Sequence, residues 1–324
     1  MATSATVSGP YRGMRLRLSL CLIALGAFAA AGAAAFSREG SDTRVARARY
    51  AMGTLLEIEA YAPDPRSAEA GVAAAFRAVE EVEQRLSNWR PDSELSVANR
   101  SAAAGPAPLT APTYRSLYRA LSFARETGGA FDPTVGRTYV GWEYARLDPR
   151  GRTLLFARPD GAIDSGGFGK GEGLDHALAA LARHGVTAAR LNFGGQVSLA
   201  GSSSRVARRL RLDEVAVAEP RAGSTRELGR FSPGDGSVST SAQSERPGHI
   251  RDPRTGGPAP FTGSVTVVAD TGFAADALST ALFVLGPQAG LDYADRRGIA
   301  ALYVIPRGEE WQLFASRRFP PINH

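Results

Sequence analysis

The chain has 324 residues, of which 44% are hydrophobic, so it can bury a full core and disorder is not the default expectation. Its formal net charge of +6 would suit a nucleic acid, but the basic residues are scattered without an arginine run interleaved with aromatics, so no nucleic-acid partner is expected. The single cysteine excludes a disulfide framework and a cysteine metal site.

The N-terminal residues 1–35 have the three-part pattern of a secretory signal peptide. Three arginines precede an apolar run from Leu18 to Ala35, which ends in three alanines before a polar stretch. An uncleaved N-terminal anchor is the alternative, because the run approaches the length that spans a bilayer. In either case we expect an exported protein, in the periplasm or at the outer face of the inner membrane, and an anchor would associate it with that membrane.

Residues 36–49 form a short polar stretch, which predicts a linker, and periodic segments begin at Tyr50. From Leu56 to Ala60, apolar residues alternate with glutamates, which predicts a strand half-buried on one face. An apolar stripe predicts a helix that begins at Ser67. A second helix is expected over 112–126, where a pair of glycines stops it.

The rest of the chain mixes strands and helices without strict alternation. The region 200–237 is rich in arginine, glycine and serine, which predicts hairpins and surface loops. The other expected elements are a helix over 174–181, a strand over 188–193, a strand over 264–269, a helix over 274–285, a helix after Pro287, and strands over 300–305 and 311–315. This order favours the α+β class, with mixed or antiparallel sheets packed against helices in a single compact domain over 50–324.

A glycine-rich stretch runs from Asp164 to Gly173 and contains Lys170, the only lysine among 38 basic residues. A compact ammonium group fits a phosphate where a planar guanidinium does not, although codon drift would also leave one lysine behind. The stretch predicts a pyrophosphate site, because it combines a lysine and a helix N-terminus with backbone N–H groups that no Cβ atom crowds. It is not a Walker loop, since neither Ser nor Thr follows the lysine.

Asp276 and Thr280 are four positions apart in an expected helix, so their oxygens lie one turn from each other on the same face. A carboxylate and a hydroxyl in this arrangement offer two hard oxygen ligands to Mg²⁺. The alternative is that Asp276 caps the N-terminus of the helix.

His249 lies in a loop with several turn-forming residues and is one of four histidines in the chain. It could accept a proton from an attacking hydroxyl, or it could be an ordinary exposed loop histidine. A lysine loop, a pair of hard oxygens and a histidine would together suit metal-assisted attack on a phosphoanhydride.

Eight stretches, in order, carry a resemblance to a known family. They are Ala51–Thr54, Ser87–Leu95 with Asn99, Gly129–Thr134, Asp164–Gly173, Asn192–Gly195, Thr240–Ser241, His249–Gly256 and Ala275–Thr280. They resemble signatures of the ApbE family of FAD:protein FMN transferases, and the resemblance extends over about Tyr50 to Ala315. It implies an ApbE-type, T-fold-like domain that transfers FMN from FAD to a threonine or serine hydroxyl of an acceptor flavoprotein and releases AMP.

The resemblance also implies roles for individual residues. Asp276, Thr280 and the carbonyl of Gly167 would hold Mg²⁺, and such an oxygen site also accepts Mn²⁺. Lys170 and Asp276 would be catalytic with His249, which would act as a base or only as a binding residue. The residues implied to line the FAD site are Met52, Trp89, Ala130, Phe131, Asp132, Asp164, Lys170 and His249.

Four positions depart from the usual family pattern. Gln196 stands where an acidic residue commonly follows the paired glycines, and Trp89 stands where tyrosine is common. Gly169 replaces an alanine before the lysine, and Ala242 replaces a glycine after Thr-Ser. The loss of a carboxylate at Gln196 would weaken a second metal or a loop contact.

The function expected from the resemblance is FMN transfer to a flavoprotein of a membrane electron-transfer system. Modification of the chain itself is not expected, because it has no clear copy of the Asp-x-x-Thr/Ser-Gly-Ala-like motif that the family modifies. Two alternatives use the same pocket. Attack by water would make the protein an FAD pyrophosphatase that yields FMN and AMP, and a non-catalytic protein would bind or deliver intact FAD.

Overall fold

The computed structural model describes residues 42–323 apart from 136–140, 245 and 309, so the predicted signal peptide or anchor over 1–35 lies outside the described residues. Residues from Thr43 onward form one compact unit. The linker predicted over 36–49 is wrong from Thr43, because strand β1 covers Thr43–Ala51. Along β1 only Val45 is buried, so no stripe of buried residues marks this strand.

The main sheet has eight strands in the order β1-β2-β6-β7-β10-β11-β12-β13, and each neighbouring pair in it is antiparallel. After β1, its members are β2 (Thr54–Ala62), β6 (Ala188–Phe193), β7 (Gln196–Ala200), β10 (Gly236–Ala242), β11 (Ser264–Ala269), β12 (Ala300–Arg307) and β13 (Glu310–Ala315). The α+β class predicted from the sequence is confirmed.

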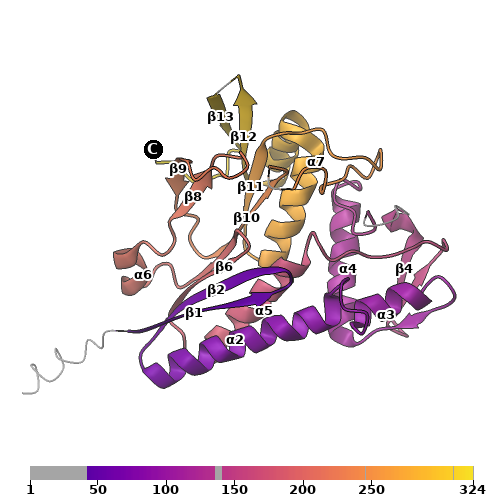
Figure 1. The fold of residues 1–324 in the computed structure, drawn as a ribbon, viewed down its shortest axis with the longest axis horizontal. Coiled ribbons are helices and arrows are strands. Elements are labelled where there is room, and N and C mark those ends of the chain that lie inside the picture. Colours follow the sequence, from indigo (N-terminus) through magenta and orange to yellow (C-terminus); the bar gives the residue numbers. More distant parts are fainter. Residues whose placement is uncertain (1–41, 136–140, 245, 309, 324) are drawn as a thin grey trace, which may run out of the picture. The chain divides into compact units, whose positions relative to one another are not determined.

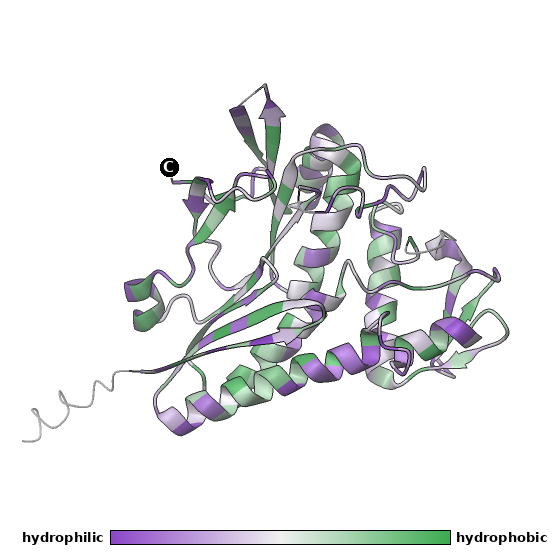
Figure 2. Cartoon of the chain, in the orientation of Figure 1, coloured by the Kyte–Doolittle hydropathy of each residue, from purple (hydrophilic) through white to green (hydrophobic). Residues whose placement is uncertain are grey.

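Three helices cover one face of this sheet: α2 (Pro65–Leu86), α5 (Gly169–Arg183) and α7 (Gly272–Arg297). Helix α2 begins where Asp64 accepts a hydrogen bond from the backbone N–H of Ser67 and proline occupies the first turn. In α2 the buried residues, among them Val72, Phe76 and Val79, belong to the same core cluster as β2 and β6, and Figure 2 shows hydrophilic residues along the exposed side of this helix. Burial of these apolar residues against the strands holds the two layers together.

The opposite face of the sheet is covered in part by a hairpin of β8 (Val215–Ala218) and β9 (Glu227–Phe231). Phe231 of this hairpin belongs to the same hydrophobic cluster as Val197 and Leu199 of β7. A short helix α6 (Arg205–Leu210) precedes it. The hairpin agrees with the prediction for 200–237, whereas α6 was missed because it has only six residues and no apolar stripe.

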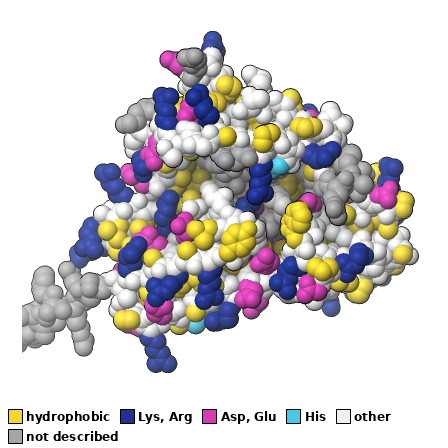
Figure 3. Space-filling view, viewed as in Figure 1, with side chains coloured by type: hydrophobic (Ala, Val, Ile, Leu, Met, Phe, Trp, Pro, Cys, Tyr) yellow, Lys and Arg dark blue, Asp and Glu magenta, His cyan; other side chains and the backbone are white. Residues whose placement is uncertain are grey.

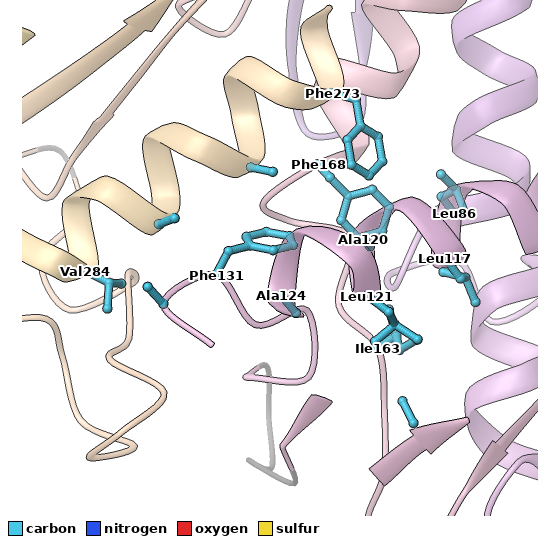
Figure 4. Close-up of a cluster of buried hydrophobic side chains, with 14 of the residues drawn as sticks. Leu86, Leu117, Ala120, Leu121, Ala124, Phe131, Ile163, Phe168, Phe273 and Val284 are labelled. Carbon is cyan, nitrogen blue, oxygen red and sulfur yellow. The ribbon is translucent and has the colours of Figure 1, made fainter. Parts of the chain in front are cut away.

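A smaller region stands beside the helical layer. It contains α3 (Glu94–Ser101), α4 (Ala111–Glu126), the 3₁₀ helix η1 (Trp142–Tyr144), and a three-stranded sheet of β3 (Ala107–Pro108), β5 (Thr153–Phe156) and β4 (Ala145–Asp148). Phe168, within the glycine-rich stretch, joins this region to α7, since its ring centroid lies 5.2 Å from that of Phe273 (Figure 4). The glycine-rich stretch is therefore fixed to the core by a fully buried aromatic ring.

Helix α7 contains both helices predicted at its position. They are merged across a kink at Gly286, which has a positive φ of 75° and is followed by Pro287. Proline cannot continue the hydrogen-bond pattern of the preceding turn, so the kink lies where the sequence separates the two segments. Within the described residues, no helix is both long enough and apolar enough to cross a bilayer.

Candidate active site

Lys170 in the first turn of α5 lies beside Asp276 in the second turn of α7. Lys170 Nζ lies 3.8 Å from Asp276 Oδ2, and the backbone N–H of Gly171 donates to the same oxygen at 3.2 Å. Asp276 is only 5% exposed. Burial raises the pKa of Asp276, while the charge of Lys170 and the N–H of Gly171 act in the opposite direction. The arrangement places a buried acid beside the chain's one lysine.

The two helices approach closely at a pair of glycines. A Cβ atom on Gly171 would lie 2.1 Å from the carbonyl oxygen of Gly272, and a Cβ atom on Gly272 would lie 2.5 Å from the carbonyl oxygen of Gly171. Any side chain at either position would push the helices apart. At least one glycine of the lysine loop is therefore explained by packing and not by contact with a ligand.

The three predicted metal ligands lie near this contact. Thr280 lies one turn after Asp276 and its Oγ1 donates to the backbone carbonyl of Asp276 at 3.2 Å. A Cβ atom on Gly167 would lie 3.5 Å from Thr280 Oγ1 and 3.0 Å from the ring of Phe131, so the α-carbon of Gly167 lies close to Thr280. The N-cap of α7 is Thr271, whose side chain accepts from Ala274 N, so the alternative role of Asp276 as the cap is wrong.

These three oxygen ligands are of the kind that Mg²⁺ prefers. They are one carboxylate, one hydroxyl and one backbone carbonyl, all hard oxygens, and Mg²⁺ is commonly held by one or two carboxylates with waters and substrate phosphates. Among the residues that the structure describes, no group of three or more His, Cys, Asp or Glu side chains could hold a metal ion. A metal held through Asp276 would therefore depend on the neutral oxygens around it. The role of Gly167, Asp276 and Thr280 as ligands stays a prediction.

Two asparagines hold the start of the glycine-rich stretch. Asn99 exchanges two hydrogen bonds of 2.9 Å with the backbone of Ile163, and Asn88 donates to Ile163 O at 2.7 Å and accepts from Ser165 N at 2.8 Å. The family resemblance includes both asparagines, but their role in holding this loop was not foreseen. Trp89 follows Asn88 directly and is 94% exposed, so its ring is available to a ligand or partner.

The carboxylate of Asp132 accepts hydrogen bonds from its own loop. Its Oδ1 accepts from the backbone N–H and the hydroxyl of Thr134 at 2.8 and 2.7 Å, and its Oδ2 accepts from Trp142 N at 3.1 Å. Burial raises the pKa of Asp132, and these hydrogen bonds oppose the shift. The neighbouring Ala130 and Phe131 are buried in the core, so the structure gives all three a packing or loop-forming role beside any contact with FAD.

Asp164 and Met52 lie in tight turns. The backbone N–H of Asp164 donates to Pro133 O at 2.6 Å, which joins the glycine-rich stretch to the Asp132 loop, and its carboxylate accepts from Gly166 N at 2.8 Å. Met52 has a positive φ of 43° between β1 and β2, and its N–H donates to Glu83 of α2 at 3.1 Å. A non-glycine residue in this conformation marks a turn that the surrounding contacts impose.

His249 lies on an exposed loop. Its Nδ1 lies 2.5 Å from the carbonyl oxygen of Arg246, which places the proton of a neutral ring on Nδ1 and leaves Nε2 able to accept one. Arg254 ties the loop to α7 by donating to Val284 O at 3.3 Å. Among the described residues, no hydrogen bond or ion pair joins the imidazole to Lys170 or Asp276, so its proposed part in the reaction stays a prediction.

Gln196 is buried between the sheet and the start of α7. Its Nε2 donates to the carbonyl oxygen of Gly272 at 2.8 Å and to Ser237 Oγ at 3.3 Å, whereas its Oε1 has no hydrogen-bond partner among the described atoms. A residue that departs from the family pattern is thus in direct contact with the helix that carries Asp276.

Figure 3 shows a hollow near the middle of one face, with Lys and Arg as well as Asp and Glu side chains around it. Two other hollows, of about 380 and 440 Å³, lie over the outer face of β1, β2 and β6 and beside β4 and β5, and neither is lined by Lys170 or Asp276. The site is therefore defined by the contacts between α5 and α7 and not by either of these hollows.

Comparison with known proteins points to one family. The model of the ApbE family matches residues 52–146 and 137–303. The FAD:protein FMN transferase of Treponema pallidum (strain Nichols) is 29% identical over 305 residues, which cover 80% of this chain and 84% of that protein. The FAD:protein FMN transferase of Vibrio cholerae (strain O395) is 27% identical over 308 residues, which cover 83% of this chain and 90% of that protein.

The fold is also similar to solved structures. The flavin transferase ApbE from Vibrio cholerae superimposes with a TM-score of 0.75 and 26% sequence identity, over 86% of this chain and 99% of that chain. The ApbE protein of Thermotoga maritima has the same fold, with a TM-score of 0.74 over 85% of this chain and 97% of that chain. Since the family model covers most of the described residues and the fold agrees, the chain belongs to the ApbE family.

Proposed function

We propose that this protein is an Mg²⁺-dependent FAD:protein FMN transferase, which attaches FMN to a threonine or serine hydroxyl of an acceptor flavoprotein and releases AMP. The observation that carries the proposal is the contact between Lys170 and Asp276, with Thr280 and Gly167 nearby, close to the N-terminal ends of α5 and α7. Membership of the ApbE family, whose similar members are named FAD:protein FMN transferases, supports it.

The reaction is a transfer of a phosphoryl-linked flavin. The oxygen of the acceptor hydroxyl forms a bond to the phosphorus on the riboflavin side of FAD, and the bond from that phosphorus to the bridging oxygen breaks, so AMP leaves with the electron pair. Bound Mg²⁺ would supply charge neutralisation to the pyrophosphate. Lys170 contributes a second positive charge, localised on one nitrogen, beside a carboxylate largely removed from water.

The proton of the acceptor hydroxyl needs a base. His249 is the proposed acceptor, through the Nε2 atom that its contact with Arg246 leaves unprotonated. If His249 only binds the flavin or the phosphate, its replacement would still reduce activity. The two roles differ in pH dependence, because only a base requires the neutral imidazole.

We place the reaction outside the cytoplasm, on flavoproteins of a membrane electron-transfer system, because the N-terminal sequence has the pattern of an export signal or anchor. Mn²⁺ would replace Mg²⁺ in a site made of oxygen ligands.

The test is covalent flavin fluorescence in a denaturing gel. The protein is incubated with FAD, Mg²⁺ and an acceptor that carries the Asp-x-x-Thr/Ser-Gly-Ala motif, and compared with Lys170→Ala and Asp276→Ala. We expect a fluorescent acceptor with the unaltered protein and a loss of at least about a hundredfold in each variant. Asp292→Ala is the matched control, because Asp292 is an exposed aspartate later in the same helix.

Three other outcomes would contradict the proposal. Free FMN and AMP formed at the same rate with and without acceptor would indicate a pyrophosphatase. FAD that stays intact in the presence of Mg²⁺ and acceptor would indicate a binding or delivery protein. Equal loss of transfer in Asp292→Ala and Asp276→Ala would remove the assignment of the site.

A further inference from the structure

The carboxylate of Asp175 holds the start of α7 from a neighbouring helix. Asp175 lies in α5, and its Oδ1 accepts from the backbone N–H of Gly272 at 2.5 Å while its Oδ2 accepts from that of Phe273 at 3.1 Å. These N–H groups open α7 and have no partner within the helix itself. The N-cap residue Thr271 satisfies a different N–H, that of Ala274. Asp175 therefore adds an interhelical link to the ordinary cap.

Arg119 of α4 in turn holds Asp175. Its Nη2 lies 3.8 Å from Asp175 Oδ2, and its guanidinium carbon lies 4.0 Å from the ring centroid of Phe273. The same guanidinium donates to the buried Glu172 at 3.1 Å, which also accepts from Ser116 Oγ at 2.7 Å. Three helices, α4, α5 and α7, are thus joined by one polar network at the base of the site.

The network lies one turn from each member of the reactive pair. Lys170 precedes Asp175 in α5 by five residues, and Asp276 follows Gly272 in α7 by four. Between them the backbones touch at Gly171 and Gly272, where no side chain interlocks the helices. Displacement of α7 along α5 is therefore opposed by polar contacts. They are the two hydrogen bonds that Asp175 accepts from the start of α7 and the one that Gly171 donates to Asp276.

We propose that Asp175, held by Arg119, is a positioning residue that sets the distance from Lys170 to the oxygens of Asp276 and Thr280. The inference rests on the proposed function, because these oxygens matter as ligands of the metal. Residues behind a metal ligand commonly change metal affinity by about tenfold to a hundredfold when they are replaced. An error of about 1 Å in such an arrangement is enough to reduce the rate greatly.

The experiment compares Asp175→Ala and Asp175→Asn with Asp64→Ala in the full-length protein. Asp64 is the matched control, since it also accepts two hydrogen bonds at a helix start, from the N–H and the hydroxyl of Ser67, but belongs to α2. One measurement is the Mg²⁺ concentration that gives half-maximal FMN transfer. The other is the Mg²⁺-dependent rise in melting temperature with FAD present, which needs no turnover.

We expect Asp175→Ala to raise the Mg²⁺ requirement by about tenfold or more and to shift the melting response to correspondingly higher Mg²⁺. Asp175→Asn should shift the Mg²⁺ requirement and the melting response in the same direction but by less. The carbonyl oxygen of asparagine can still accept a hydrogen bond from one of the two N–H groups, whereas its NH₂ group cannot accept one from the second. Asp64→Ala should lower the melting temperature and leave the Mg²⁺ requirement unchanged.

Arg119 provides an independent variant. Arg119→Ala should behave like Asp175→Ala, and Arg119→Lys should restore part of the Mg²⁺ response because it keeps the positive charge. The inference is wrong if Asp175→Ala and Arg119→Ala lower the melting temperature, as Asp64→Ala does, but leave the Mg²⁺ requirement unchanged. Asp175 would then only stabilise the fold. If Asp175→Ala does not fold, Asp175→Asn and Arg119→Ala decide by the same criterion.

Failure of the proposed function gives a different result. The unaltered protein could bind FAD and show a Mg²⁺-dependent rise in melting temperature but transfer no FMN. The proposed function would then be wrong, whereas the melting temperatures of the variants would still test the role of Asp175. If the unaltered protein shows no response to Mg²⁺ with FAD, there is no metal site for Asp175 to position and the inference is overturned.

Discussion

The amide of Gln196 gives this chain a contact that an acidic residue at the same position cannot make. Its Nε2 donates to Gly272 O and Ser237 Oγ, so a carboxylate there would face a carbonyl oxygen without a proton to offer. The missing carboxylate is thus accompanied by a direct hydrogen bond to the start of α7, whereas its effect on a second metal stays a prediction. The sequence could not predict that Gln196 donates to Gly272, because Gly272 lies 76 positions away and the acceptor is its backbone carbonyl.

We expect Gln196→Glu to lower the free energy of unfolding by about 1–3 kcal/mol at neutral pH, because a buried donor is lost and an acceptor is placed against an acceptor. Denaturant unfolding followed by tryptophan fluorescence measures this change. Gln312→Glu, at an exposed position of β13, is the control and should be nearly neutral. If the two variants are equally stable, the hydrogen bond from Gln196 to Gly272 contributes nothing to the free energy of unfolding.

Composition and spacing were sufficient to single out some residues of the site. Lys170 is marked by being the only lysine, and Asp276 and Thr280 by their helical spacing. Asn88, Asn99 and Asp175 hold the site through backbone N–H and carbonyl groups, which are present at every position and leave no pattern in the sequence. Their role needs the fold to be known.

Among the elements, the junction of α5 and α7 has the strictest steric requirement. We expect Gly171→Ala to lower the free energy of unfolding by about 1–3 kcal/mol or more, because its Cβ would overlap the backbone carbonyl of Gly272, which cannot rotate away. FMN transfer should fall with it, since the separation of Lys170 and Asp276 must grow. Thermal melting and the gel assay measure the two effects.

The control for this variant is Gly105→Ala. A Cβ atom on Gly105 would have no atom within 4 Å, and its φ is not positive, so the substitution should be neutral or slightly stabilising. Unchanged stability in Gly171→Ala would mean that the helices separate without cost, and the proposed importance of their close approach would be refuted.

Helices with a wide apolar stripe were predicted to within a few residues, as α4 shows, where 112–126 was expected and Ala111–Glu126 is observed. Strand β1 was missed because its single buried side chain, Val45, gives no period. The strand is specified instead by its antiparallel pairing with β2, including the ion pair from Arg44 to Glu59 across the two strands. Tertiary pairing of this kind is invisible to a local pattern.

On the scale of the whole molecule, residues from Thr43 onward form a compact unit of their own. A chain shortened to 43–324 should therefore melt in one cooperative transition within about 2 °C of the full-length protein and keep its FMN transfer. Calorimetry and the gel assay test this. A chain beginning at Ala51 is the informative comparison, because it lacks β1 and should expose the apolar edge of β2 and aggregate.

A large loss of stability in 43–324 would show that the preceding residues are part of the folded unit, contrary to expectation. Equal behaviour of the two shortened chains would show instead that β1 contributes little to the sheet.

The hydrogen bond from Gly171 to Asp276 joins positions 105 apart in the chain, and α7 lies near the C-terminal end of the sequence. Contacts between such distant segments form after local ones, because closing a long loop costs entropy before any contact repays it. A refolding chain consequently has no paired lysine and aspartate until α7 docks on α5. FAD and metal can act only on the finished molecule, so they should stabilise it against unfolding without accelerating its folding, which stopped-flow refolding with and without FAD and Mg²⁺ would measure.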